Sequence, residues 1–449
     1  MKGFSQRAGI DYSETFSPVA RYESVRTLLA VAAAKDFEIH QFDVKTAFLY
    51  GDLDEEIFME QPDGFDDGSG RVCRLRKSLY GLKQAPRQWH SKFDEFVQKF
   101  GLTPTTADPC VYRSVDGELL LALYVDDGLV VGRSIEKIEE LLSALREQLE
   151  TTTSEASCYL GIEITRDRKA KVVKLSQAAY ARNVLERFSM SEANPVTTPT
   201  ETTALRKNRE ETADVPYREL VGSLMHLAVA TRPDLSYAVS TLSKFLENPS
   251  KEHWSAGKRV LKYLAGTVDV GLTFCRDSSN ELVAYSDADF AACVDSRKSI
   301  SGVVLMLNDG PVVWSSRKQT VVATSTTDAE YVAAHDAAKE IAWIRRLLAD
   351  IGCEQVEPTT LFCDNQAAEK LVENPVYHQR TKHIDVKFHY TRDLVKKGEI
   401  EVVHVCSALQ RADMFTKPLT RLKFEHNRKL LNVGGVGRVG VLELRAPDA

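Results

Sequence analysis

Two adjacent aspartates, Asp126 and Asp127, offer the clearest chemistry in the sequence. They lie between apolar runs at 119–123 and 129–131, so the pattern predicts a β-hairpin whose turn is the Asp-Asp-Gly segment. Neighbouring carboxylates repel each other unless a cation lies between them. Mg²⁺ suits a site of few carboxylates that substrate phosphates complete. Taken alone, the pair could also be an ordinary Asp-Gly hairpin tip.

A third carboxylate, Asp43, ends a segment at 38–44 that alternates apolar and polar residues, as a half-buried strand does. One carboxylate from one strand and a pair from a neighbouring hairpin can hold two Mg²⁺ ions. In a polymerase palm, one ion activates the primer hydroxyl and the other steadies the leaving pyrophosphate. Asp43 by itself would more often be a turn residue at a strand end.

A second set of carboxylates lies in the last third of the sequence. Strand-like segments end at Asp287 and Asp364, a long helical pattern carries Glu330 near its start, and Asp413 follows a last strand-like segment at 399–405. Any one of these would most often be a solvated surface residue. As a group they could bracket two metal ions and the scissile phosphate of an RNA strand, with water as the nucleophile.

Four motifs then follow one another in the order and spacing of a known family. They are Gln-Phe-Asp-Val-Lys-Thr-Ala-Phe-Leu at 41–49, Ser-Leu-Tyr-Gly-Leu-Lys-Gln-Ala-Pro-Arg at 78–87, Tyr-Val-Asp-Asp at 124–127 and Tyr-Leu-Gly-Ile at 159–162. Together they resemble the reverse transcriptase of copia-type LTR retrotransposon Pol polyproteins. The resemblance runs from about Lys2 to Leu419, and it implies that Asp43, Asp126 and Asp127 are the metal-binding catalytic triad.

The resemblance also implies which residues bind nucleotide, template and primer. Phe48 matches the aromatic residue that packs against the sugar and excludes a 2′-hydroxyl, although it could also be a core ring. Tyr80 and Gly81, with Lys83, match the segment that contacts the incoming nucleotide and the template. Gly81 could instead be a loop glycine chosen for backbone freedom. The pair Leu160–Gly161 matches the primer grip, a hairpin that holds the primer end.

The order Asp287, Glu330, Asp364, Asp413 resembles the ribonuclease H that is fused to reverse transcriptases. The same resemblance makes these four the metal ligands and catalytic residues for cleaving RNA in RNA–DNA hybrids. His383 and Asp385 lie at the start of an apolar stripe with helical spacing, so we assign them to a helix start and not to the site. An integrase-type strand transferase also uses this fold, but the paired Asp motif and the order of the carboxylates disfavour it.

The implied fold is α+β: right-hand polymerase fingers and palm with a helical thumb and connection, followed by an α/β ribonuclease H-like domain with a mixed sheet. The predicted boundaries are 1–193 for the reverse transcriptase fingers, palm and primer-grip region, 194–280 for the linker and helical thumb or connection, 281–420 for ribonuclease H and 421–449 for a tail. At 449 residues the chain is long enough for domains with separate cores.

The net charge of −6 is unexpected for a protein that binds nucleic acid. Binding would then depend on local basic faces and not on the total. Basic residues interleaved with the aromatic Tyr80 and Trp89 suit a phosphate backbone and stacked bases. A solvated charged loop is the alternative reading of this cluster, which comprises Arg71, Arg74, Arg76, Lys77, Lys83 and Arg87.

Some classes of protein are disfavoured by composition. The sequence contains no run of 18 apolar residues and no signal-peptide pattern, so we expect no membrane span. Its eight cysteines form no CxxC pair, which argues against a zinc site and fits reduced thiols. We therefore expect a cytoplasmic location, including virus-like particles, with the nucleus as an alternative.

The sequence thus predicts an RNA-directed DNA polymerase with ribonuclease H activity. It would use Mg²⁺ or Mn²⁺, two ions per active site, and would bind an RNA template, a DNA primer, RNA–DNA hybrid and dNTPs. A homodimer and other Pol polyprotein segments are further candidate partners.

Two departures from the family qualify this prediction. Family members carry a basic strand before residues 3–7 that grips the triphosphate, so we expect an N-terminally truncated segment in which polymerisation is slowed by about 100-fold or more. The alternative is a polymerase-inactive remnant that only binds nucleic acid or keeps hybrid cleavage. Gly128 stands where an apolar β-branched residue is usual, and we expect it to loosen the strand without removing a ligand.

Overall fold

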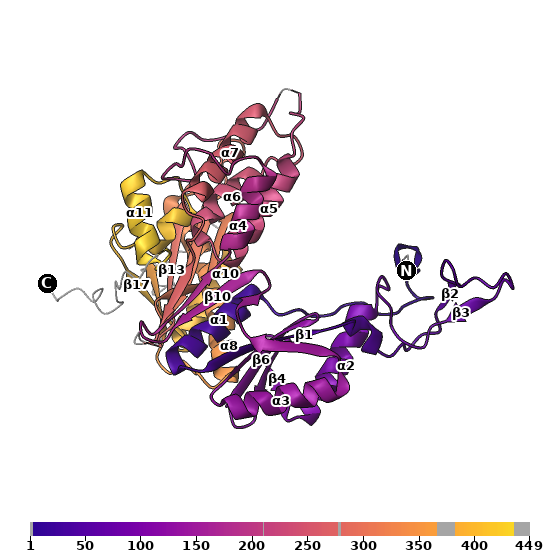
Figure 1. Cartoon of the computed structure of the whole chain (residues 1–449). Helices are drawn as coiled ribbons and strands as arrows, with labels where there is room; N and C mark the ends of the chain where they lie inside the picture. Colours follow the sequence, from indigo (N-terminus) through magenta and orange to yellow (C-terminus); the bar gives the residue numbers. More distant parts are fainter. Residues whose placement is uncertain (1–2, 210, 277–279, 366–381, 435–449) are drawn as a thin grey trace. The chain divides into compact units, whose positions relative to one another are not determined.

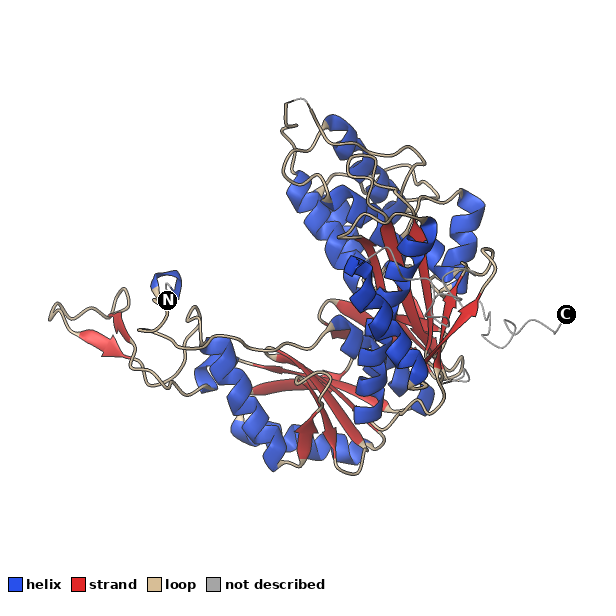
Figure 2. Cartoon of the chain, turned by 180° about the vertical axis from the view of Figure 1, so that it is seen from behind, coloured by secondary structure: helices blue, strands red, loops and turns tan. Residues whose placement is uncertain are grey.

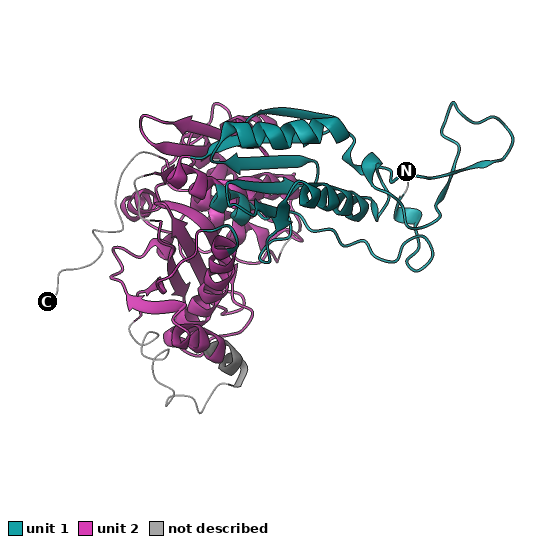
Figure 3. Cartoon of the chain, turned by 90° about the horizontal axis from the view of Figure 1, so that it is seen from below, with its two compact units in different colours: residues 1–28, 37–156, 350–352 teal, residues 29–36, 157–349, 353–449 magenta. Residues whose placement is uncertain are grey.

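The structure is a computed structural model that describes residues 3–209, 211–276, 280–365 and 382–434. The chain forms two compact units, coloured separately in Figure 3. The first comprises residues 1–28, 37–156 and 350–352, and the second comprises residues 29–36, 157–349 and 353–449. Each unit contains its own sheets and is described by itself.

The first unit is built on a six-stranded antiparallel sheet in the order β4-β5-β6-β7-β1-β8 (Figure 1). The inner strands β6 and β7 are apolar and buried along nearly their whole length, as the two apolar runs around the acidic pair predict. The strands are β1 (Glu38–Val44), β4 (Leu102–Pro104), β5 (Val111–Ser114), β6 (Leu119–Tyr124), β7 (Asp127–Gly132) and β8 (Thr151–Glu155).

Two amphipathic helices, α2 (Ala85–Lys99) and α3 (Ile135–Gln148), pack their apolar sides with strands β1, β6 and β7 into one core. A proline in the first turn of α2 and the side chain of Ser134, which caps α3, favour helix starts at these positions. The smaller elements are η1 (Gly3–Ser5), α1 (Tyr22–Lys35), η2 (Ala47–Tyr50) and the ribbon of β2 (Phe58–Glu60) with β3 (Val72–Arg74). Helix α1 begins in the first unit and ends in the second.

The second unit begins with a four-stranded antiparallel sheet in the order β12-β11-β10-β9. Its strands are β9 (Cys158–Tyr159), β10 (Ile162–Asp167), β11 (Val172–Ser176) and β12 (Leu272–Cys275). Between β11 and β12 the chain is helical, as the spacing of its apolar residues predicts. The helices are α4 (Ala178–Arg187), α5 (Tyr217–Ala230), η3 (Pro233–Leu235), α6 (Ser236–Ser243) and α7 (Lys251–Ala265).

A five-stranded mixed sheet in the order β15-β14-β13-β16-β17 forms the rest of the second unit (strands red in Figure 2). Strands β13 to β15 pair antiparallel, whereas β16 lies parallel to both β13 and β17. The strands are β13 (Val283–Asp289), β14 (Ile300–Leu307), β15 (Gly310–Lys318), β16 (Thr359–Cys363) and β17 (Ile400–His404); the helices are α8 (Thr326–Asp350), α10 (Lys382–Lys396), η5 (Arg411–Phe415) and α11 (Arg421–Leu430).

The predicted α+β class with a mixed sheet in its last part is therefore confirmed. The compact units divide near residue 157, so β9 to β11 and α4 lie in the second unit. The functional boundaries predicted at 193, 280 and 420 are a different kind of division and stay predictions. Among the helices that the structure describes, none has the length and apolar character needed to cross a membrane.

Candidate active sites

Strand pairing brings the first three carboxylates together. Asp43 in β1 and Asp127 at the start of β7 are direct partners across the antiparallel pair. Tyr124 pairs with Asp127, so the turn consists of Val125 and Asp126. The predicted Asp-Asp-Gly turn is therefore wrong by two residues: Asp127 and Gly128 already belong to β7.

The turn is held by a contact from outside the hairpin. Val125 has a φ of 58°, a left-handed conformation that is unusual for a β-branched residue. The indole Nε1–H of buried Trp89 donates to the Val125 carbonyl oxygen over 2.6 Å, and the N–H of Val44 donates to the Asp126 carbonyl over 3.0 Å. Strained backbone is retained where surrounding structure fixes it, often at functional sites.

Burial and mutual repulsion dominate the electrostatics of this triad. Burial, followed by the charges of Asp126 and Asp43, raises the pKa of Asp127 to about 6. Burial and the charge of Asp126 also raise the pKa of Tyr80. Carboxylates whose charges act on one another in this way are an all-oxygen donor set that suits Mg²⁺ or Mn²⁺.

Gly128 has a packing role that the sequence did not reveal. It is the cross-strand partner of Phe42, and a Cβ at this position would lie 2.0 Å from the Phe42 Cζ atom. The Phe42 ring in turn stacks on Phe93 of α2, with ring centroids 6.0 Å apart. The glycine therefore makes room for a core ring beside Asp127, which accounts for the departure from a β-branched residue.

The predicted nucleotide-contact residues lie near one another in the first unit. The rings of Phe48, in η2, and Tyr80 are 4.6 Å apart at 52°. Gly81 has a φ of 94°, so the backbone freedom of glycine is used here. The Lys83 ammonium donates to the Tyr12 hydroxyl over 3.2 Å. Phe48 and Tyr80 thus form an aromatic pair close enough to the triad for its charges to act on Tyr80.

The predicted primer grip is a tight turn in the second unit. Tyr159 pairs with Ile162, so Leu160 and Gly161 are the two turn residues between β9 and β10. Both have positive φ, at 52° and 75°. That conformation is favoured in two-residue hairpins but is strained for leucine. The hairpin is confirmed, and contact with a primer stays a prediction.

The second carboxylate cluster lies at the carboxyl ends of parallel strands. Ser286 and Cys363 are neighbours in the pairing of β13 with β16, so Asp287 and Asp364 follow side by side. Carboxylate oxygens of Asp287, Asp364 and Asp413 all lie within 4.8 Å of one another. The same limit holds for ligand atoms of Glu330, Cys363 and Asp364, so the four predicted carboxylates form one cluster.

Three residues that we did not predict position this cluster. Gln319 donates to the Ser301 hydroxyl over 2.9 Å and to the Ala329 carbonyl over 2.8 Å, which ties β14 to the start of α8 beside Glu330. Gln410 donates to the Ser286 carbonyl over 2.9 Å and accepts from the Ala412 N–H. The third is Thr416, whose hydroxyl hydrogen-bonds with the Asp287 carboxylate.

A glycine lets the fourth carboxylate approach. Gly302 in β14 is the direct partner of Asp287. A Cβ there would lie 2.7 Å from Thr416 Cγ2, 2.8 Å from the Ala412 carbonyl oxygen and 2.9 Å from Phe415 Cβ. The bare strand at Gly302 thus allows η5 to lie against the sheet and to bring Asp413 beside Asp287.

Burial dominates the electrostatics of this cluster. Burial raises the pKa of Asp287 to about 7, although the positive charge of Lys417 acts to lower it. Burial also raises the pKa of Glu330 to about 9, and the negative charges of Asp287 and Asp364 add to that rise. The pKa of Asp364 is also raised, first by burial and then by Asp413. Glu330 Oε2 is buried without a hydrogen-bond partner among the described residues. An orphaned oxygen in a buried, carboxylate-rich site fits a hard divalent cation.

Comparison with known proteins decides the family. A model described as reverse transcriptase (RNA-dependent DNA polymerase) matches residues 1–202. The retrovirus-related Pol polyprotein from transposon TNT 1-94 of Nicotiana tabacum is 44% identical over 451 residues, covering 96% of this chain and 34% of that protein. A putative transposon Ty5-1 protein of Saccharomyces cerevisiae is 33% identical over 313 residues, covering 67% of this chain and 100% of that protein. The chain belongs to the copia-type retrotransposon Pol family.

This Pol chain spans about a third of the length of the plant Pol polyproteins that it matches. A solved foamy viral protease–reverse transcriptase in complex with RNA/DNA hybrid is similar with a TM-score of 0.47 and 12% identity, covering 85% of this chain and 45% of that chain. The family predicted from the four ordered motifs is confirmed by the family model and the sequence relatives.

Half of the predicted basic face of the Pol chain is paired with acids. Arg71 contacts Asp67 over 2.5 Å and Arg74 contacts Glu56 over 2.6 Å. Lys77 forms an ion pair with Asp52. These exposed pairs reduce the free positive charge that the cluster offers to a phosphate backbone.

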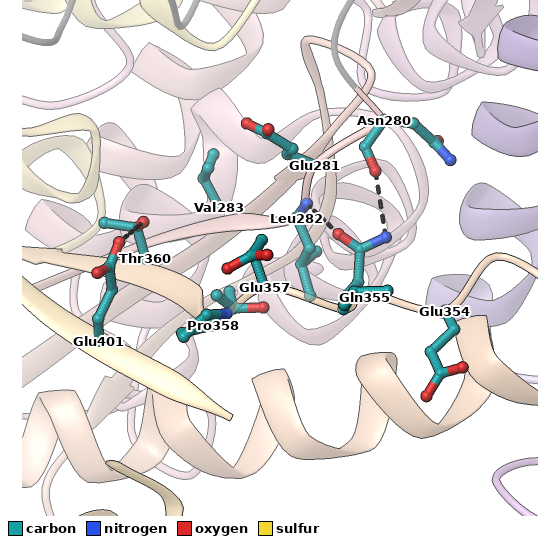
Figure 4. Close-up of a pocket in the computed structure, with 12 residues that line it drawn as sticks. Asn280, Glu281, Leu282, Val283, Glu354, Gln355, Glu357, Pro358, Thr360 and Glu401 are labelled. Carbon is teal, nitrogen blue, oxygen red and sulfur yellow. Dashed lines mark hydrogen bonds between the residues drawn. The ribbon is translucent and has the colours of Figure 1, made fainter. Parts of the chain in front are cut away.

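Two other features of the Pol chain belong to the second unit. Helix α10 begins at Lys382, so His383 and Asp385 are helix-start residues as predicted. A pocket of about 680 Å³ lies at the beginnings of β13 and β16, opposite the strand ends that carry Asp287 and Asp364 (Figure 4). Its lining includes four glutamates and, among the described residues, no lysine or arginine, so it does not suit a phosphate: Glu281, Glu354, Glu357 and Glu401.

Proposed function

We propose that the chain is an RNA-directed DNA polymerase and an RNA–DNA hybrid endoribonuclease, with one activity at each carboxylate cluster. The observation that carries the proposal is the convergence of seven carboxylates into two clusters in a chain of the Pol family. Its substrates would be an RNA template with a DNA primer, dNTPs and the resulting hybrid.

The first cluster supports nucleotide addition. Strand pairing fixes Asp43 opposite Asp127, and the bond from Trp89 fixes the turn that carries Asp126. Phe48 and Tyr80 form an aromatic wall on which the sugar and base of an incoming nucleotide would rest.

The second cluster supports hydrolysis of one RNA strand. Asp287 and Glu330 are buried, and Thr416 orients the Asp287 carboxylate. Gln319 and Gln410 hold the helix and the turn that supply Glu330 and Asp413. Two divalent ions per cluster, Mg²⁺ or Mn²⁺, held by these carboxylates would supply charge for the phosphate and a more acidic nucleophile.

A paired assay on the purified full chain tests the proposal. Primer extension on RNA and cleavage of RNA in a hybrid would be measured with Mg²⁺ for the wild type, Asp126→Asn and Asp287→Asn. We expect each variant to lose at least about 100-fold of its own activity and to keep the other. Neither activity in the wild type, or extension that survives Asp126→Asn, would overturn the assignment. Hybrid cleavage without extension would favour the alternative of a polymerase-inactive remnant.

A further inference from the structure

The cluster around Asp287 contains a lysine that the proposed mechanism does not use. The Lys417 ammonium lies 2.7 Å from Asp413 Oδ1 and 3.6 Å from Asp287 Oδ2. Asp287 is 2% exposed and Asp413 is 4% exposed, so both carboxylates are shielded from water. Within the described ranges, no other lysine or arginine forms an ion pair with the four carboxylates.

Buried carboxylates held this closely are unfavourable without a counter-charge. The counter-charge here comes from the same short segment that supplies Asp413, four residues further along the chain. Thr416 lies directly before Lys417. Its hydroxyl hydrogen-bonds with the Asp287 carboxylate and with the Asp413 carbonyl oxygen. The segment therefore delivers a ligand and a cation to the same place.

The two ends of this contact differ in their exposure to solvent. The carboxylates are fixed by β13 and η5, whereas the Lys417 side chain is 36% exposed and reaches the cluster from the surface. A long lysine stem can withdraw its ammonium into water by rotating about its side-chain bonds. The ammonium can thus leave while the carboxylates stay.

We propose that Lys417 is a built-in counter-ion that holds the Asp287–Asp413 pair together before a divalent cation binds, and that the cation displaces its ammonium. Lys417 is then a positioning residue that sets how tightly the site takes the metal. The inference rests on the proposed ribonuclease function only in assuming that a divalent cation binds here.

The charge predicts the direction of the effect. Removing a positive charge a few ångströms from the carboxylates strengthens their attraction for a cation. We therefore expect Lys417→Met to bind Mn²⁺ at this cluster at least about tenfold more tightly. The same variant should unfold at a lower temperature in EDTA, since the carboxylates then repel each other, and Mn²⁺ should restore it.

The test uses the full chain and Lys423→Met as a matched control, because Lys423 is an exposed lysine of nearby α11. Mn²⁺ binding would be measured by calorimetry, and the binding step lost in Asp287→Asn marks this cluster. Thermal unfolding in EDTA and in Mn²⁺ would accompany it. We expect Lys423→Met to match the wild type in both measurements.

A second measurement needs no variant. Labelling of lysines in the wild type with an amine-specific reagent, followed by mass spectrometry, should show Lys417 becoming more reactive when Mn²⁺ is added and Lys423 unchanged. The counter-ion proposal would be overturned if Lys417→Met bound Mn²⁺ no more tightly than the wild type. It would also be overturned if the labelling of Lys417 did not change when Mn²⁺ is added. If no Mn²⁺ binding in the wild type depends on Asp287, the proposed metal site itself fails, which is a different result.

Discussion

The triad of the first unit lies at the tip of an antiparallel hairpin, whereas the cluster of the second unit lies at the ends of parallel strands against a short 3-10 helix. The triad residues are all partly exposed, and three of the four cluster residues are buried. The cluster accordingly has a lysine among its carboxylates, together with a hydroxyl and two glutamine side chains that fix the elements around it. In a partly exposed site, water and substrate can stabilise the charged carboxylates. In a buried site, the counter-charge has to come from the protein itself.

The two sites share one feature, which is a strand glycine opposite a predicted catalytic aspartate or next to one. Gly128 admits the ring of Phe42, and Gly302 admits the backbone and side chains of η5. Substituting alanine at each glycine therefore tests which site depends more on the close approach of neighbouring atoms to the strand.

The largest effect is expected for Gly302→Ala. Its Cβ would meet a backbone oxygen as well as two side chains, and backbone cannot move aside locally. We expect η5 to lift from the sheet and to carry Asp413 away, which should reduce hybrid cleavage by about 100-fold or more while primer extension stays near the wild type. Gly222→Ala is the control, because a Cβ at Gly222 meets nothing within 4 Å. Unchanged cleavage in Gly302→Ala would show that the cluster does not depend on this approach.

A smaller effect is expected for Gly128→Ala. Here the three atoms nearest to the added methyl all belong to the Phe42 ring, a side chain that can shift at the cost of overpacking the core it shares with Phe93. We expect a loss of about 1–3 kcal/mol in the stability of the first unit and about a tenfold loss of primer extension, with hybrid cleavage retained. Hydrogen exchange of β1 and β7 would report the stability change. Loss of cleavage to the same extent as extension would contradict independent sites.

These glycines also mark what the sequence could and could not reveal. The strand predicted at 38–44 matches β1 residue for residue, because the alternation of apolar and polar residues is a local signal. The four motifs and the order of the carboxylates located both clusters. The turn at Val125–Asp126 was missed because the left-handed valine depends on the bond from Trp89, a residue 36 positions away.

The roles of Gly128, Gly302 and Lys417 were missed for the same reason. Each depends on a contact between distant segments or on the burial of a partner, and neither can be read from spacing along one chain. The roles of Gln319 and Lys417 became interpretable only when the fold placed them against Ala329 and Asp287.

The smallest effect is a dependence of stability on pH that separates the two sites. The pKa of Asp287 is about 7 and that of Glu330 about 9, both above the values of 3.8 and 4.5 expected in the unfolded chain. The folded cluster therefore binds more protons than the unfolded chain, so its contribution to stability is full below about pH 4 and is lost as pH rises, through 7 for Asp287 and through 9 for Glu330. In EDTA we expect β13 and β16 to lose protection from hydrogen exchange progressively between pH 5 and 8.

The stability of the strands around the triad should also fall as pH rises, but over a narrower pH range. The pKa of Asp127 is raised only to about 6, and the site is partly exposed. Mg²⁺ should reduce the loss at both sites, since a cation favours the ionised carboxylates that high pH supplies. A Glu330→Gln variant removes one titrating group from the cluster and should flatten the dependence of β13 and β16 alone. If their protection instead rose with pH in EDTA, the carboxylates would already be ionised in the folded chain, and Lys417 would have to neutralise the cluster more completely than its contacts with Asp287 and Asp413 indicate.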